Sequence, residues 1–254
     1  MLVLKLLLVP VFLLLISLAG KRWGPSVAGW LAGLPVVAGP ILLFLACERG
    51  RLFASNAASA SLSAVLASVC FSLAYAHAAQ QMTWPRSLSL GLIAWLAAAF
   101  GLALLPVSLP LAACIAILAL LFAPRWFPAG KLRPYPRLVS PAELCCRMLA
   151  GVALTVAVTF AAGKLGQAWS GLLAVFPVLG TVLAVFAHRA HGPAYAATLL
   201  RAMVTGLYAF AIFCLSLSIV LPRMNTTTAF FISVAAALAV QAATRKRVIA
   251  PKIR

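Results

Sequence analysis

Long apolar runs separated by short basic segments dominate the chain. A helix needs about 20 apolar residues to cross the hydrocarbon core of a membrane. Runs of this length recur along the sequence, with lysines and arginines between them. The pattern predicts nine spans, at 2–20, 26–47, 53–78, 87–105, 108–124, 144–163, 168–187, 194–221 and 227–244. The predicted fold class is therefore all-α, a polytopic membrane helix bundle without a soluble domain.

The basic residues give this count an orientation. Nine spans place the two termini on opposite faces of the membrane. The face of the N-terminus receives Arg49, Arg51, Lys164 and Arg223. The other face receives Lys21, Arg22, Arg86, Arg125, Lys131, Arg133, Arg137, Arg189, Arg245, Lys246, Arg247, Lys252 and Arg254. Because basic loops mark the cytoplasmic side, we expect the C-terminus in the cytoplasm and the N-terminus outside.

Composition and charge exclude several other classes. Hydrophobic residues make up 65% of the chain and charged residues 9%, which is too little charge for a soluble surface. The net charge of +18 indicates contact with anionic lipid headgroups rather than nucleic acid, because the basic residues stand in short loops. The six cysteines lie mostly in apolar runs without metal-binding spacing. We expect no cofactor and no enzymatic activity, since the spans hold no recognisable catalytic pair.

Identical residues recur at an offset of 142 positions across the window 24–73. The pairs include Gly24/Gly166, Gly29/Gly171, Leu31/Leu173, Pro35/Pro177 and Gly50/Gly192. They divide the chain into a four-span repeat at 1–105, a linker span with a basic loop at 106–142, a second four-span repeat at 143–247 and a basic tail at 248–254. An offset of five spans turns the second copy upside down. Inverted repeats are common in secondary transporters, although a duplication can also build a larger bundle that transports nothing.

Each copy carries one span interrupted by glycine and proline, and the two spans occupy matching places. Pro35 and Pro177 each remove one helical N–H and push on the carbonyl four residues back. Such a pair indicates a substrate site near the midplane of the membrane. The alternative is an ordinary kink with glycines for close helix packing. The candidate substrate-binding residues in these spans are Gly29, Leu31, Pro35, Gly171, Leu173, Pro177 and Thr181.

A few polar residues fall inside or beside the predicted spans. Arg201 lies about two turns inside a span, where it can bind an anionic substrate or extend to the headgroups. The serine-rich stretch 55–72 suits either tight helix packing or a water-lined face. Glu143 precedes Arg147 by four residues and is expected to pair with it. Glu48 and Arg49, at an outer helix end, are further candidates.

One pattern resembles a known family. Its residues are Ala28-Gly29, Leu34-Pro35 and Glu48-Arg49-Gly50 in the first copy, and Ser170-Gly171, Phe176-Pro177 and Gly192 in the second. They resemble the small four-span GlpM-type proteins of the bacterial inner membrane, except that Ala190 and His191 replace the Glu-Arg pair in the second copy. The resemblance implies a bacterial inner-membrane protein, made by fusing two copies of a unit that elsewhere pairs with itself. It also implies a link to envelope and exopolysaccharide processes.

Two functions are therefore open. The first is a permease for a small or lipid-linked anionic substrate, bound by Arg201 and the interrupted spans. The second is a scaffold subunit that transports nothing and belongs to an envelope-polysaccharide or lipid-processing assembly, with a homodimer or an assembly partner as its contact. A hydrated cavity that reaches both interrupted spans favours the permease, because a scaffold needs none.

Overall fold

The structure, a computed structural model, describes residues 2–105, 108–128, 140–164 and 176–249. Within these ranges every regular element is a helix, so the predicted all-α class is confirmed there. The helices are α1 (Leu2–Trp23), α2 (Pro25–Ala32), α3 (Ala38–Arg49), α4 (Arg51–Ser63), α5 (Val65–Ala78), α6 (Trp84–Ala103), α7 (Leu109–Phe122), the short 3-10 helix η1 (Ala123–Arg125), α8 (Pro141–Lys164), α10 (Val178–His191), α11 (Pro193–Val220) and α12 (Thr226–Ile249).

Six of the described stretches are long and apolar enough to cross a membrane, as expected for an integral membrane protein. They are Leu6–Trp23, Arg51–Ala78, Trp84–Ala103, Pro141–Phe160, Pro193–Val220 and Thr226–Arg245. Of the other three predicted spans, two are not continuous helices of that length, and the third is described only in part. Span 26–47 is divided into α2 and α3, span 108–124 forms the 14-residue α7, and span 168–187 is described only from Phe176 onward.

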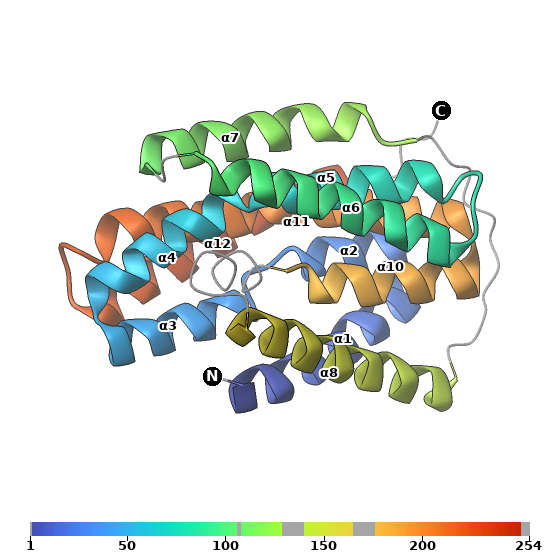
Figure 1. The fold of residues 1–254 in the computed structure, drawn as a ribbon, viewed down its shortest axis with the longest axis horizontal. Coiled ribbons are helices and arrows are strands. Elements are labelled where there is room, and N and C mark those ends of the chain that lie inside the picture. The colour runs from blue at the N-terminus through green and yellow to red at the C-terminus, as the bar shows by residue number, and fades with distance from the viewer. Residues whose placement is uncertain (1, 106–107, 129–139, 165–175, 250–254) are drawn as a thin grey trace.

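Helix α11 lies at the centre of the bundle and packs against α2, α4, α5, α7, α10 and α12. Helices α4 and α5 follow one another almost in line and cross α11 in the opposite direction. This direction follows from the contact of Ser55, near the start of α4, with Ser218, near the end of α11. Figure 1 shows α7 along one side of the molecule and α1 with α8 along the opposite side.

The helix boundaries coincide with the offset found in the sequence. Stretch Arg51–Ala78 corresponds to Pro193–Val220, and Trp84–Ala103 corresponds to Thr226–Arg245. Helices α3 and α10 also end at equivalent residues, and each is followed by a glycine with a positive φ, 88° at Gly50 and 86° at Gly192. Residues with a side chain rarely adopt this conformation, which explains why glycine stands at both positions.

Helix α2 is held tightly between α11 and α12. A Cβ atom on Gly29 would overlap the carbonyl oxygen of Leu199 in α11, so the missing side chain lets the two backbones touch. On the α12 side, Trp30 donates through Nε1 to Oγ1 of Thr244, at 3.0 Å. Gln241 in turn donates to the carbonyl oxygen of Trp30, at 3.0 Å. These contacts fix the end of α2, where the chain leaves the helix.

Candidate functional site

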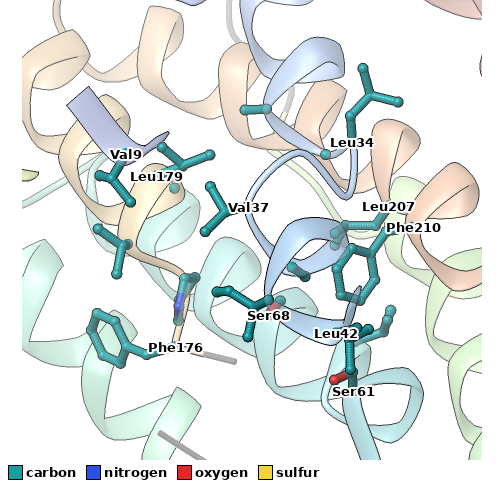
Figure 2. A pocket seen from close by; sticks show the side chains of 18 of the residues that line it. Val9, Leu34, Val37, Leu42, Ser61, Ser68, Phe176, Leu179, Leu207 and Phe210 are labelled. Carbon is teal, nitrogen blue, oxygen red and sulfur yellow. The ribbon is translucent and has the colours of Figure 1, made fainter. Parts of the chain in front are cut away.

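A cavity of about 380 Å³ lies beside the break between α2 and α3 and the start of α10 (Figure 2). Leu34 and Val37 border it from the break, and Phe176 and Leu179 border it from the start of α10. The remaining walls come from α1, α3, α4, α5, α8 and α11, and most of their side chains are apolar. The cavity therefore reaches both of the interrupted spans that the sequence singles out.

The break in the first interrupted span has a clear local cause. Helix α2 ends at Ala32, residues 33–37 are not helical, and α3 begins at Ala38. Pro35 has no N–H and cannot continue the helical hydrogen bonding. The carbonyl of Leu31 accepts a hydrogen bond from the N–H of Leu34, at 3.2 Å. The protein itself thus satisfies this carbonyl, which was one candidate for binding a ligand.

Two helices begin at the cavity wall. Val37 and Ala38 lie at the start of α3, and Pro177 and Val178 lie at the start of α10. The N–H groups of a first helical turn lack partners within the helix and carry a partial positive charge. Here the N–H of Gly39 already donates to the carbonyl of Pro35, and that of Val178 donates to the carbonyl of Phe176, both at 2.8 Å. The remaining first-turn N–H groups and the helix dipoles favour an anion or another electron-rich group in the cavity.

The polar side chains of the wall are hydroxyls, and two of them, those of Ser68 and Thr159, make no hydrogen bond within the described part of the chain. Ser61 donates to the carbonyl of Ala57 at 2.8 Å, and Thr155 donates to the carbonyl of Gly151 at 2.7 Å. The hydroxyl of Ser68 makes no hydrogen bond within the described part of the chain, although the residue is only 7% exposed. No charged side chain of the described residues lines the cavity. Ser68 is more deeply buried than Thr159, so it is the hydroxyl whose donor a ligand in the cavity would best satisfy.

The structure brings some of the predicted site residues to the cavity. Pro177 lines it, while Pro35 does not, although its neighbours Leu34 and Val37 do. Thr181 is buried in the first turn of α10, and its hydroxyl has no partner among the described residues. Gly29 packs against α11 rather than bordering the cavity. Gly171 and Leu173 lie outside the described residues.

The three charged candidates lie elsewhere. Arg201, Glu48 and Arg49 are exposed, and none of them borders the cavity. On α11 the cavity-lining face includes Met203 and Leu207, at helical spacing. Arg201 stands two residues before Met203, about 200° around the helix from it. This periodicity could have separated Arg201 from the cavity in the sequence alone.

Sequence reasoning missed that Arg147 is a buried cation, only 6% exposed. Its pairing with Glu143 is confirmed, at 2.5 Å. Arg147 also donates to the hydroxyl of Ser17 at 3.2 Å, and its Cζ lies 5.5 Å from the ring centroid of Phe186. Its Nε has no partner among the described residues. Ser17 and Phe186 are far from Arg147 in the sequence, so no local spacing signals this arrangement.

Neither a metal-binding group among the described residues nor a similar protein indicates which substrate or reaction the protein serves. Among the described residues no group of three His, Cys, Asp or Glu side chains could hold a metal ion. The similarity to GlpM-type proteins around Glu48-Arg49-Gly50 stays a prediction. Comparisons with protein-family models, with curated proteins and with solved structures found no match to the chain.

Proposed function

We propose that the protein is a permease of the bacterial inner membrane, built from two inverted repeats, which binds a small or lipid-linked anion in the cavity. The observation that carries the proposal is the position of the cavity between the interrupted spans, which occupy equivalent places in the two copies. Secondary transporters bind substrates near the midplane with discontinuous helices whose inner ends face the site.

Helix directions support the inversion. Helices α1 and α8, which are equivalent under the 142-residue offset, pack antiparallel, since Arg147 meets Ser17 and Gly151 lies against Leu13 one turn further along. Helices α4–α5 and α11, also equivalent, cross antiparallel through Ser55 and Ser218. An inverted duplication brings each central helix against its own equivalent in this way.

The depth of the cavity supports a midplane site. Helix α2 has 8 residues and α3 has 12. At about 1.5 Å per residue they measure roughly 12 and 18 Å. The break between them therefore falls near the middle of a hydrocarbon core about 30 Å thick.

The walls indicate what kind of anion fits. Helix starts and the Ser68 hydroxyl can bind an oxyanion, while the apolar side chains suit a hydrocarbon portion. A substrate with both parts matches the lipid-linked anion better than a fully hydrated ion. In this proposal Arg201 is not part of the binding site.

Basic and aromatic residues at the ends of the helices fit the proposed lipid contacts. The Cζ atom of Arg22 lies 5.4 Å from the Trp23 ring centroid, and that of Arg189 lies 5.4 Å from the Trp84 ring centroid. Tryptophan and arginine favour the membrane interface and anionic headgroups. We place these residues on the cytoplasmic face, with the N-terminus outside.

Thiol modification tests the cavity without knowledge of the substrate. In the full chain, the six native cysteines are replaced and Ser68→Cys is introduced. Right-side-out and inside-out vesicles are treated with an impermeant anionic methanethiosulfonate and with its cationic counterpart. A permease predicts that Ser68→Cys reacts, and reacts faster with the anionic reagent. Ser72→Cys, one turn away and 0% exposed, is the matched control and should stay unreactive.

The scaffold alternative predicts a different result. If no water reaches the cavity, folded Ser68→Cys protein will be as inert as Ser72→Cys from both faces of the membrane. That result would end the permease proposal, because a transported anion needs a hydrated route to the interrupted spans.

A further inference from the structure

Three successive layers of side chains connect the cavity to one end of the bundle. Residues four apart on a helix share a face, so Thr155, Gly151 and Arg147 of α8 point the same way. The cavity reaches Thr155 of α8 and Val9 of α1. Because α1 and α8 are antiparallel, the next layers along α1 contain residues further from the N-terminus.

The second layer closes the cavity. Leu13 of α1 is 0% exposed and fills the space beside Gly151 of α8. A Cβ atom on Gly151 would overlap Cδ1 of Leu13 and would lie 3.2 Å from Cγ1 of Val9. The side chain of Leu13 therefore fills the contact between α1 and α8, between the cavity wall and the layer that holds Arg147.

The third layer holds a buried cation. Arg147 is bonded to Glu143 and Ser17 and lies over the ring of Phe186, so it joins α8, α1 and α10. Its Nε is buried without a partner among the described residues, which leaves one donor for a further acceptor. A guanidinium group presents its donors in a planar fork that matches carboxylate and phosphate oxygens.

The chain offers few acidic residues that could pair with this cation. The sequence holds two acidic residues, and the other one, Glu48, is exposed at the far end of α3. A buried charge that loses its partner destabilises a protein strongly, so Arg147 needs Glu143 whenever no other anion is present. The Glu143 side chain is 22% exposed and can turn toward water when it is released.

We infer that the Arg147–Glu143 pair is a gate, and that an oxyanion leaving the cavity replaces Glu143 as the partner of Arg147 while Leu13 moves aside. Arg147 is then the residue that selects for negative charge on this half of the path. The inference rests on the proposed permease function, because a gate requires a path. It also explains why the buried cation lies directly beyond the cavity on the same face of α8.

The gate is tested in the Ser68→Cys protein without other cysteines. Glu143→Gln keeps an amide oxygen that Arg147 can bond but removes the charge that holds the gate closed. We expect the anionic methanethiosulfonate, applied from the Arg147 end in inside-out vesicles, to react about tenfold faster than in the parent, as when a minor open state rises from about 1% to about 10%. The rate from the opposite end should not change.

A second pair of variants separates charge selection from structure. Glu143→Gln with Arg147→Gln removes both charges and leaves no lone buried charge, so the protein should stay folded. In this double variant the gate opens but the preference for the anionic over the cationic reagent at the Arg147 end should disappear. Arg201→Gln, which removes an exposed cation outside the cavity, is the control and should leave both rates unchanged.

The source of the oxyanion is resolved by competition. Two competitors are compared for their ability to slow the reaction of the anionic reagent with Ser68→Cys in the Glu143→Gln protein. One is inorganic phosphate, in vesicles of phosphatidylcholine. The other is phosphatidylglycerol, added to the same vesicles. Slowing by phosphate assigns the gate to a soluble anion, and slowing by phosphatidylglycerol assigns it to a lipid headgroup. If neither competes with the sulfonate reagent, Arg147 is not an oxyanion site and the inference is wrong.

The two proposals fail in distinguishable ways. If Ser68→Cys reacts from the opposite end but Glu143→Gln leaves both rates unchanged, the pair is only structural and the permease proposal stands. Equal reactivity of the parent from both ends would also overturn the gate, because a closed layer at Leu13 forbids it. If Ser68→Cys reacts from neither end in any variant, both proposals are wrong.

Discussion

Gly33, directly after α2, and Gly206 of α11 meet with no side chain between them. A Cβ atom on Gly33 would overlap the backbone of Gly206, and one on Gly206 would overlap the carbonyl oxygen of Trp30. Gly33 is also the first residue of the break and lines the cavity, so this contact holds the backbone in place at the point where α2 ends. Close helix packing and the interruption of the helix thus depend on the same glycine.

The first prediction is that Gly206→Ala destabilises the protein. The added methyl group meets a carbonyl oxygen rather than a flexible side chain, and overpacking of this kind costs about 1–3 kcal/mol. Thermal unfolding in detergent should show a lower midpoint. Gly101→Ala is the control, because nothing lies within 4 Å of its new Cβ atom and alanine favours the helix. Equal midpoints for the two variants would contradict the close contact.

The second prediction is a disulfide between α4 and α11. The hydroxyl oxygens of Ser59 in α4 and Ser218 in α11 lie 3.1 Å apart. Cysteine sulfurs at the same two side-chain positions need only a small further approach to reach the S–S bond length of about 2.05 Å. Ser59→Cys with Ser218→Cys, without the native cysteines, should therefore oxidise within one chain and shift mobility on a non-reducing gel. Ser89→Cys with Ser218→Cys is the control, since Ser89 is exposed on α6. A bridge that forms only between two chains would argue against the antiparallel crossing.

The sequence alone did not show which serines of the stretch 55–72 pack against another helix and which border the cavity. The two interpretations of this stretch are tight helix packing and a water-lined face, and its serines divide between a helix contact and the wall of the cavity. Ser55 and Ser59 pack against Ser218 of α11, whereas Ser61 and Ser68 border the cavity. Composition alone could not separate these faces, because the partner helix lies more than 150 residues away along the chain.

Local patterns predicted the helices better than the site. Pro35 lies in the break between α2 and α3, and Pro177 directly precedes the start of α10, because a proline disturbs its own helix wherever it stands. The chain borders the same cavity at both places. Arg201 was chosen for its depth in a span, but depth does not say which way a side chain points. The buried position of Arg147 depends on Ser17 and Phe186, which only the folded chain brings near it.

The third prediction concerns the faces of the membrane. The hydroxyl oxygen of Tyr75, near the end of α5, lies 3.4 Å from Nδ1 of His188, near the end of α10. Both helices therefore end on the same face of the membrane. Helix α11 leaves that face and, with 28 residues, is about 42 Å long. Gln81→Cys and Asn225→Cys, both exposed, should therefore react with impermeant reagents from opposite sides, with Gln81→Cys on the cytoplasmic side. Labelling of both from one side would contradict this arrangement.

The last prediction concerns Arg201, which lies on the exposed side of α11 away from the cavity-lining Met203. An exposed arginine within a span reaches the headgroups with its long side chain, and a lysine does so equally well. Arg201→Lys should therefore preserve abundance and thermal stability, while Arg201→Ala should lower abundance moderately. Neither change should alter the reaction of Ser68→Cys with the anionic reagent, because Arg201 does not border the cavity.

Arg147→Lys is the informative comparison for Arg201→Lys, because the same exchange is made at a buried site. Lysine cannot reproduce the planar fork with which Arg147 donates to both Glu143 and Ser17. The free energy of unfolding of the Arg147→Lys variant should therefore fall by about 1–3 kcal/mol. The two exchanges are compared by thermal unfolding and by the anionic-to-cationic reaction ratio of Ser68→Cys. If Arg201→Lys lowered that ratio in a fully stable protein, Arg201 would act on the substrate from outside the cavity. The anchoring role would then be wrong, and the anion path would have to pass along the outer side of α11.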